Sequence, residues 1–301
     1  MRVLITGSRG SLGRHLLRAL STDPRFDSVI GVDIREPDCF DIREPMDGML
    51  RQHRIDAVVH AAFIVNPIRD EELMAHINVE GSRNVLRCSI AAGVRHFIFI
   101  SSATVYGFHP NDGEPYTEDA PRCPNRGFVY GEHKCIVERM LESAAESAVT
   151  ILRPSFLVTR EGGNPLLQYI AHRLPVLPYP AAPLQMTHIE DMVEILRLVL
   201  LNGVVGVFNV GAAGALDVAS MTRRLGHVPI RLPYVPLSML NRVAWKYHVP
   251  IAPAPAWAMQ VLRHPWIVSS DRLTRETGYA FRYTSSAAFE DFAAYQLHRG
   301  L

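Results

Sequence analysis

The sequence lacks most of the features that mark a secreted, disulfide-bonded or metal-binding protein. Its four cysteines, in 301 residues, form no C-x-x-C pair, and their dispersal is typical of reduced thiols in a cytosolic protein. The 13 histidines are equally scattered, with no H-x-x-x-H pair and no cluster with cysteine. We therefore expect no metal site and a cytoplasmic location.

Export signals and membrane spans are also missing. The first residues, MRVLITG, run directly into a buried-strand pattern, without the apolar region and cleavage site of a secretory signal. The longest apolar region, MVEILRLVLLNGVVGVFNV, is interrupted by Glu194, Arg197 and an Asn-Gly pair, so it predicts a helix followed by a strand. A membrane-surface helix is an alternative for residues 236–248, but their few Lys and Arg residues disfavour it. We predict no membrane partner.

An excess of charge of one sign is absent as well. Lys and Arg total 31 against 30 Asp and Glu, which gives no basic field for nucleic acid. Any anionic ligand must therefore be held by a local site. The length and the 48% hydrophobic content fit one large α/β domain with an appended lobe.

The N-terminal half alternates apolar, strand-like runs with helical stretches. Strands are predicted at RVLITG, SVIGVD, AVVHAA, HFIFISS, VTILRP and GVFNVG, and helices through Leu20, over residues 71–92 and around Tyr130. This alternation implies right-handed βαβ crossovers, and so an α/β fold with a Rossmann-type, doubly wound parallel sheet. Such sheets bind ligands at the carboxyl ends of their strands. We assign residues 1–155 to this domain and expect residues of about 187–211 to return to it.

Prolines concentrate beyond residue 155, in RLPVLPYPAAP, HVPIRLPYVP and HVPIAPAPAW. Proline-rich connections around short apolar segments predict a smaller, loop-rich lobe that covers the open edge of the sheet. We therefore expect residues 156–301 to form mainly a substrate-binding lobe.

The stretch LITGSRGSLGRHLL places Gly7, Gly10 and Gly13 between the first strand and the first helix. Glycine there permits a tight turn and the close approach of a diphosphate to the N–H groups at the start of the helix. Asp33 ends the second strand, twenty residues after Gly13. A carboxylate at that place accepts hydrogen bonds from ribose hydroxyls and repels a 2′-phosphate, which favours NAD over NADP. Arg9 and Arg35 lie nearby and weaken that preference.

Tyr130 and Lys134, in FVYGEHK, are four residues apart and share one face of the predicted helix. A surface pair on a solvated face is the alternative for such a spacing.

Nine motifs in order resemble the extended short-chain dehydrogenase/reductase family, the NAD-dependent epimerase/dehydratase group. They are T-G-x-x-G-x-x-G, FDIRE, VVHAA, INVEGSRNVL, FISSATVYG, YGEHK, LRPSFL, THIEDM and SSDRLTRETGY. The resemblance covers nearly the whole chain.

This resemblance implies Ser102, Tyr130 and Lys134 as catalytic residues. Tyr130 would exchange the hydroxyl proton of an alcohol, which requires its pKa to fall by roughly 3 units, or about 4 kcal/mol. The Lys134 ammonium and the oxidised nicotinamide would each supply part of that shift, and Lys134 would hold the nicotinamide ribose. Ser102 would hydrogen-bond the substrate oxygen, with Ser101 as the alternative.

The same resemblance implies contacts with NAD at the glycine turn, at the strand ends and on two helices. The expected residues are Gly7, Arg9, Gly10, Ser11, Leu12, Gly13, Asp33, Asp41, Ile42, Ala61, Ala62, Asn78, Ser101, Tyr130, Lys134, Pro154 and Ser155. Alternatives are a loop acid for Asp41, a core side chain for Ile42 and a helix-surface amide for Asn78. His60, His133 and His188 are interpreted as packing or supporting groups.

The predicted function is NAD-dependent hydride transfer at a carbinol or carbonyl carbon, with a nucleotide-sugar 4-epimerase or dehydratase as the first substrate hypothesis. In PLQMTHIEDM the usual diphosphate-binding arginine is missing, Arg263 matches a second one only loosely, and RPSFLVTREGGNP departs from R-P-x-x-x-Y-G-P. A dehydrogenase or reductase of an apolar ketone or alcohol, sterol-like or phenolic, is therefore an alternative. A non-catalytic NAD-binding sensor or scaffold is another. The resemblance also implies a homodimer through helix 71–92 and the tyrosine helix.

Overall fold

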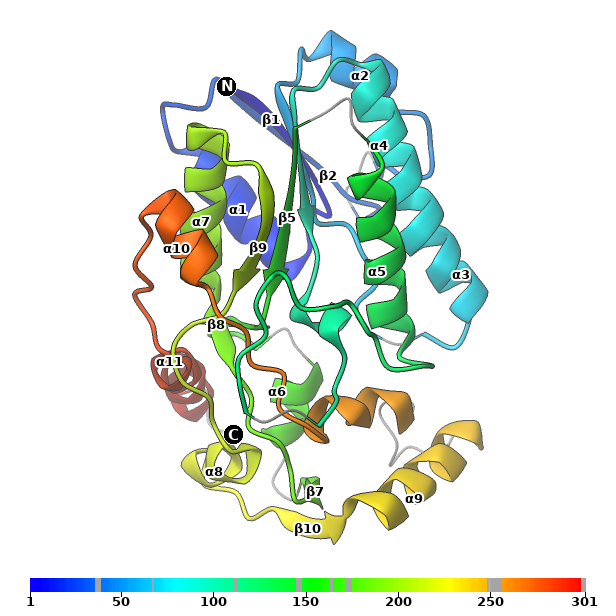
Figure 1. Cartoon of the computed structure of the whole chain (residues 1–301), viewed down its shortest axis with the longest axis vertical. Helices are drawn as coiled ribbons and strands as arrows, with labels where there is room; N and C mark the ends of the chain where they lie inside the picture. The colour runs from blue at the N-terminus through cyan, green and yellow to red at the C-terminus, as the bar shows by residue number, and fades with distance from the viewer. Residues whose placement is uncertain are drawn as a thin grey trace.

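Six parallel strands form the centre of the computed structural model (Figure 1). The structure describes residues 1–35, 39–66, 68–110, 113–144, 148–162, 165–171, 175–247, 249 and 256–298. The strands are β1 (Arg2–Thr6), β2 (Ser28–Val32), β3 (Ala57–His60), β4 (His96–Ile100), β5 (Ala148–Pro154) and β9 (Gly206–Val210). Their order in the sheet is β2-β1-β3-β4-β5-β9. The predicted α/β fold with a Rossmann-type parallel sheet is confirmed.

Helices cover both faces of this sheet (Figure 1). On one face lie α1 (Ser11–Ser21) and α7 (Ile189–Asn202), and on the other lie α2 (Asp47–Gln52), α4 (Ser82–Ala91) and α5 (Val129–Glu142). Burial on both faces explains why the strands are nearly continuous apolar runs such as HFIFI. The chain leaves β1 toward β2 and returns on the other side to β3, so the strand order reverses at β1. Ligands of doubly wound sheets bind at such a reversal.

The helical segment that precedes β4 is interrupted by a π-helical turn. It consists of α3 (Glu71–Ala75), the π-helix η1 (His76–Gly81) and α4. Asp70 caps its start, because its side chain accepts a hydrogen bond from the backbone N–H of Leu73 at 2.8 Å. The predicted helix over residues 71–92 is therefore present, with a change of winding in its middle.

The apolar region near residue 200 forms a helix and then a strand, as predicted. Helix α7 ends at Asn202, and Gly203 follows in the left-handed conformation with φ 60°, where glycine avoids a steric penalty. Strand β9 then pairs with β5 at the edge of the sheet. In the described ranges, no helix is long and apolar enough to cross a membrane.

Shorter elements form a second lobe below the sheet (Figure 1). Strand β6 (Phe156–Val158) pairs with β8 (Met186–His188), and β7 (Val176–Tyr179) pairs with β10 (Ile230–Pro233). The helices are α6 (Pro165–Ile170), α8 (Val218–Arg224), α9 (Tyr234–Lys246) and α11 (Ser285–His298), with 3-10 segments η2 (Ala103–Tyr106) and η3 (Ala256–Leu262). Helix α10 (Asp271–Thr277) instead packs beside α7 and the sheet, where Leu273 is part of the core (Figure 1). The second lobe has its own apolar core, which includes Leu184, Met186 and Phe289.

Candidate active site

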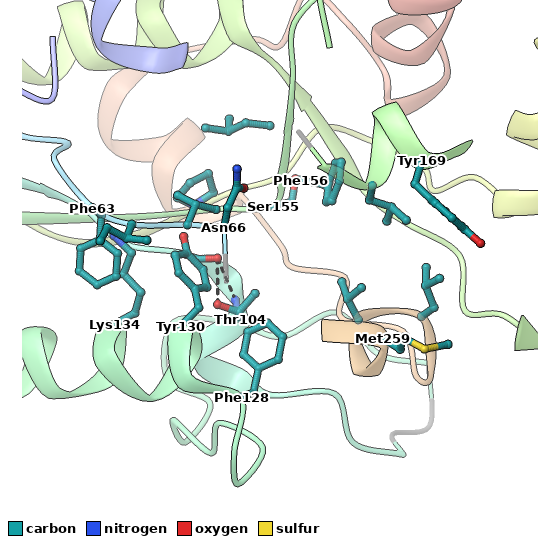
Figure 2. A pocket seen from close by; sticks show the side chains of 18 of the residues that line it. Phe63, Asn66, Thr104, Phe128, Tyr130, Lys134, Ser155, Phe156, Tyr169 and Met259 are labelled. Atoms are coloured by element: carbon teal, nitrogen blue, oxygen red, sulfur yellow. Dashed lines mark hydrogen bonds between the residues drawn. The ribbon is translucent and has the colours of Figure 1, made fainter. Parts of the chain in front are cut away.

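A cavity of about 740 Å³ extends from the glycine turn past the ends of β3, β4 and β5 into the second lobe. Figure 2 shows Phe63, Lys134, Tyr130 and Phe128 toward one end, with Tyr169 and Met259 at the other. The cavity therefore joins the strand ends of the sheet to the proline-rich part of the chain.

At Gly7 and Gly13 the glycine turn has no room for a side chain. Gly7 has φ 72°, and a Cβ atom on it would lie 2.7 Å from the Ala62 backbone. A Cβ atom on Gly13 would lie 2.1 Å from the carbonyl oxygen of Gly7. The turn and the start of α1, from Gly7 through Gly10 to Gly13 with Ser11 and Leu12, line the cavity. This close packing leaves the N–H groups at the start of α1 open to an anion.

Asp33 is buried at the end of β2 and is already hydrogen-bonded. Its carboxylate accepts from the backbone N–H groups of Arg9 and Arg35, both at 3.0 Å, and from Nε of Arg35 at 3.1 Å. Burial works against ionisation, but these hydrogen bonds outweigh it and lower the pKa of Asp33 below its usual value. The group therefore stays an anion beside the turn.

Asp41 and Ile42 lie outside the residues that line the cavity. The Asp41 carboxylate accepts hydrogen bonds from Nε of Arg43 at 3.0 Å. Ile42 is buried in the core beside α4, where a Cβ atom on Gly81 would come within 2.6 Å of it. A role for either residue at an adenine ring stays a prediction.

Asn78 supports one wall of the cavity. It is fully buried in the π-helical turn, and its side chain accepts from the N–H of Ile64 at 2.7 Å and donates to the Ile64 carbonyl at 3.1 Å. This double hydrogen bond fixes the segment after β3, of which Ala61, Phe63 and Ile64 line the cavity. Asn78 is thus not the surface amide of the alternative interpretation.

Ser101 and Ser102 face opposite ways at the end of β4. The Ser102 Oγ atom accepts from the N–H of Thr104 at 3.2 Å and from its hydroxyl at 3.0 Å, as the dashed lines of Figure 2 mark. Ser101 instead donates to the buried carboxylate of Glu138. Because Ser101 donates to Glu138, Ser102 is the serine that can donate at the cavity.

Tyr130 is half-buried between two aromatic rings at the cavity. The Phe63 and Phe128 rings meet it edge-on, at centroid distances of 5.7 and 6.3 Å. Burial raises the pKa of Tyr130 to about 12, and a hydrogen bond with Ser102 opposes this rise. The surroundings of Tyr130 therefore raise its pKa, whereas proton transfer near neutral pH requires that pKa to be lowered.

Lys134 is buried one helical turn beyond Tyr130. Its Nζ atom donates to the Ile100 carbonyl at 2.6 Å and lies 3.5 Å from the centroid of the Phe63 ring and 5.6 Å from that of Tyr130. Burial lowers the pKa of Lys134 well below its usual value, although the nearby Glu138 carboxylate raises it. Tyr130 and Lys134 thus share the cavity-facing side of α5, and the surface-pair interpretation is wrong.

Pro154 and Ser155, at the end of β5, line the cavity next to Ser102. Ser155 Oγ and Thr187 Oγ1 are 2.8 Å apart, which ties β5 to β8. The histidines lie behind these residues. His60 bridges Thr6 and Ser82 with its two ring nitrogens at 2.7 and 2.8 Å, and burial lowers its pKa to about 3.

His133 lies 3.4 Å from Asn78, and His188 caps α7 while its ring stacks on Tyr283. All three histidines therefore serve as supporting groups. Within the described part of the chain, no group of three or more His, Cys, Asp or Glu side chains could hold a metal ion.

The sequence analysis missed the buried ion pair that anchors α5 to β5. Arg153 Nη2 lies 2.6 Å from the Glu138 carboxylate, and both side chains are almost completely buried. Burial disfavours the charged form of Arg153, but hydrogen bonds to Glu138 raise its pKa nonetheless. The only available signal was that Glu138 follows Tyr130 and Lys134 at the same four-residue spacing.

The part of the cavity in the second lobe is apolar. Lys134 is the only charged side chain among the described lining residues. The wall comes from α6, β7, α9 and the residues around η3, and it includes Leu166, Val176, Leu237, Leu240, Val261 and Trp266.

Residues 3–211 match the model of the NAD dependent epimerase/dehydratase family. The chain belongs to this family. An uncharacterized protein of Mycobacterium tuberculosis is 28% identical over 96% of the chain and 82% of its own length. UDP-glucose 4-epimerase of Neisseria gonorrhoeae is 29% identical over 77% of the chain and 85% of its own length. The crystal structure of Thermus thermophilus UDP-glucose 4-epimerase in complex with NAD superposes with a TM-score of 0.78 at 20% identity, covering 100% of this chain and 99% of that one.

Family membership makes the protein an NAD-dependent enzyme of the epimerase/dehydratase class. In PLQMTHIEDM, the segment in which the resemblance leads us to expect a diphosphate-binding arginine, the residue before MTHIEDM is Gln185. That side chain is buried and hydrogen-bonded to the backbone of Ala212 and Val268 at 2.9 to 3.0 Å. Arg263 is exposed and lies over the Tyr234 ring, at 5.4 Å from its centroid. Neither residue is among those that line the cavity.

Proposed function

We propose that this protein transfers hydride between NAD and a carbinol or carbonyl carbon, with Tyr130 as the acid and base. The observation that carries the proposal is that Ser102, Tyr130 and Lys134 line the same cavity as the glycine turn. An oxidoreductase, an epimerase or a dehydratase of this type all share that step.

The residues at the turn fit a dinucleotide. The positions at which a Cβ atom would collide, Gly7 and Gly13, form a cradle at the N-terminus of α1, where N–H groups favour a diphosphate. Asp33 would accept the adenosine ribose hydroxyls and would repel a 2′-phosphate, so NAD is favoured over NADP. Lys134 would hold the other ribose. When bound, NAD supplies the atom that accepts or returns the hydride.

The pKa of Tyr130 sets the energetic requirement for the proton step. A fall from about 12 to 7 corresponds to about 7 kcal/mol of differential stabilisation. Lys134 Nζ lies 5.6 Å from the Tyr130 ring centroid, so a positive charge on Lys134 would stabilise the phenolate form of Tyr130. A protonated Lys134 would therefore supply one part of this stabilisation. Ser102 and the positive charge of the oxidised nicotinamide must supply the rest.

Ser102 is prepared to orient the substrate. Because its Oγ atom already accepts two hydrogen bonds from Thr104, its own hydrogen is the one left to donate, toward Tyr130 or a substrate oxygen. Donation to the substrate oxygen places that oxygen next to Tyr130, so that the proton and the hydride leave the same alcohol together.

Two substrate classes fit this chemistry. The names of relatives such as UDP-glucose 4-epimerase support a nucleotide-sugar, acted on by a 4-epimerase or dehydratase. An apolar ketone or alcohol, sterol-like or phenolic, is the second candidate. The wall of the second lobe favours it, because Lys134 is the only described lining residue that could neutralise a diphosphate, and the mechanism uses it elsewhere.

We also propose that residues 1–155, with residues of about 187–211, bind the cofactor and that the rest of 156–301 mainly holds the substrate. A homodimer through α4 and α5 and a cytoplasmic location remain predictions.

The test of the hydride-transfer step compares Tyr130→Phe with Tyr247→Phe, an exposed tyrosine at the end of α9. We expect Tyr130→Phe to lower kcat by about 10²-fold or more while NAD affinity, measured by calorimetry, stays within a factor of two. Tyr247→Phe should retain wild-type kcat. Near-normal turnover in Tyr130→Phe would contradict the mechanism, and NAD binding without any turnover across a broad panel would favour a sensor or scaffold.

The test of the substrate class compares UDP-glucose and UDP-glucuronic acid with steroidal and aryl secondary alcohols and ketones. Leu240→Arg places a charge on the cavity wall, whereas Met239→Arg places it on the exposed side of the same helix. For an apolar substrate, only Leu240→Arg should raise KM, by about tenfold or more. Turnover of a UDP-sugar alone would establish the first class instead.

A further inference from the structure

The exposed hydrophobic side chains are concentrated in one part of the second lobe. Among the described residues, sixteen large hydrophobic side chains are exposed, and nine of them lie between positions 228 and 249. This stretch contains β10 and α9, which form the outer edge of the lobe (Figure 1). Such a concentration is typical of an interaction surface, whereas single exposed hydrophobics need no explanation.

Helix α9 is apolar on two opposite sides. Leu237, Leu240 and Ala244 line the cavity, together with the polar side chain of Asn241. The outer stripe, defined as Val235, Met239, Val243 and Tyr247, has a four-residue spacing that keeps its members on one side of the helix. These four side chains are 59%, 63%, 55% and 67% exposed, in that order. The helix therefore separates an apolar cavity from an apolar outer surface.

The segment of the chain that contains the outer stripe carries charge of one sign. Between Asp217 and Asp271 the sequence contains six Lys and Arg residues and no Asp or Glu, although the whole chain has a net charge of only +1. Arg242 and Lys246 lie on α9 next to the stripe. In the described part of the chain, neither forms an ion pair with a carboxylate.

An apolar stripe flanked by cations requires a partner that is apolar and anionic together. A second copy of the chain would bring the same cations against Arg242 and Lys246 in a two-fold contact, which is repulsive. A bilayer with anionic headgroups meets both requirements, because the stripe reaches the acyl boundary while the cations stay among the phosphates.

We propose that α9 docks the protein on an anionic lipid surface through the outer stripe, with Arg242 and Lys246 at the headgroups. This reverses the expectation of no membrane partner, which rested on the absence of a membrane span and on the small number of Lys and Arg in residues 236–248. Docking places the cavity behind α9 next to the bilayer, where apolar alcohols and ketones accumulate. The interaction does not depend on Tyr130, so it can be tested apart from catalysis.

The experiment is flotation of the full chain with vesicles of phosphatidylcholine alone and of phosphatidylcholine mixed with phosphatidylglycerol, at low and high salt. The wild type should float with the anionic vesicles at low salt. Met239→Glu with Val243→Glu should lower the partition coefficient at least tenfold. Arg242→Gln with Lys246→Gln should lower it by about fivefold for each charge removed. Val205→Glu, which alters an exposed valine before β9, is the matched control and should bind as the wild type does.

Circular dichroism and thermal melting establish that each variant is folded. Absence of wild-type binding to anionic vesicles at low salt would overturn the proposal, and so would equal binding by the stripe variant and the Val205→Glu control. Light scattering gives a third decisive result. If the stripe variant loses an oligomeric mass that the wild type has, and neither protein floats, the stripe is an interface between copies and not a lipid-binding surface.

Discussion

The buried contact between Glu138 and Arg153 makes a sharp prediction for stability. Glu138 on α5 is fully buried and accepts from Nη2 and Nε of Arg153 at 2.6 and 3.0 Å. It also accepts from Arg122 at 3.2 Å and from the hydroxyl of Ser101. Glu138→Gln keeps the shape of the side chain but removes the charge that all of these donors share. The Arg153 guanidinium then remains buried without a counter-ion.

The expected cost follows from that burial. Removing one partner of a buried ion pair costs about 3–5 kcal/mol, because the remaining charge is desolvated and uncompensated. Glu142 provides the matched control, since it pairs with the same Arg122 at 2.7 Å but its side chain is 43% exposed. An exposed pair of that kind contributes about 0–1 kcal/mol. Glu138→Gln should therefore destabilise the protein at least three times as much as Glu142→Gln.

Urea denaturation followed by circular dichroism measures both variants. In thermal melts the difference corresponds to about 2 °C for each kcal/mol, so Glu138→Gln should lower Tm by about 6–10 °C. A double replacement, Glu138→Leu with Arg153→Met, should recover part of the loss, because no buried charge remains unpaired. If Glu138→Gln and Glu142→Gln agreed within about 0.5 kcal/mol, the argument that burial makes this ion pair costly to break would be wrong.

Three further outcomes are expected. Gly13→Ala should lower NAD affinity in calorimetry by at least tenfold, because its Cβ atom meets the Gly7 carbonyl at 2.1 Å, whereas Gly48→Ala meets no atom within 4 Å and should bind normally; equal affinities would refute this. Burial lowers the pKa of His60 to about 3, so its contribution is fully present above about pH 6.5 and is lost as pH falls toward 3. Urea denaturation should show the wild type losing about 1.4 kcal/mol more than His60→Asn for each pH unit in that window, and parallel curves would count against it. Ile136→Glu, at an exposed position on α5, should convert the predicted homodimer to a monomer in light scattering, and a monomeric wild type would exclude the dimer.

The architecture of the sheet could be predicted because burial on both faces leaves a strong sequence signal. Runs such as HFIFI and AVVH have the β-branched and aromatic composition of central parallel strands. Gly203 marks the end of α7 for a local reason, since the left-handed conformation suits glycine. The glycine turn and the Tyr130–Lys134 spacing were likewise visible, because their function requires fixed residue types at fixed separations.

The side chains that surround the site could not be predicted from the sequence in the same way. The Glu138–Arg153 ion pair joins a helix to a strand. No periodic pattern in the sequence shows which buried charged residues will form such a pair. The rise of the Tyr130 pKa depends on Phe63 and Phe128 packing around it, which follows from tertiary structure alone. For α9, apolar residues on both sides blur the 3.6-residue pattern, so the sequence does not tell the cavity side from the outer side.

The π-helical turn at His76–Gly81 makes the length of this segment as important as its composition. A π turn holds about one residue more than an α turn, so deleting one residue there would let a regular α-helix form. Because the extra residue is absorbed within the turn, the segments before and after it would keep nearly the same relative orientation. Val85 and Cys88 would keep their places in the core, whereas Asn78, inside the turn, would move and lose its hydrogen bonds to Ile64. One inserted position thus allows a single helix to serve both the cavity and the core.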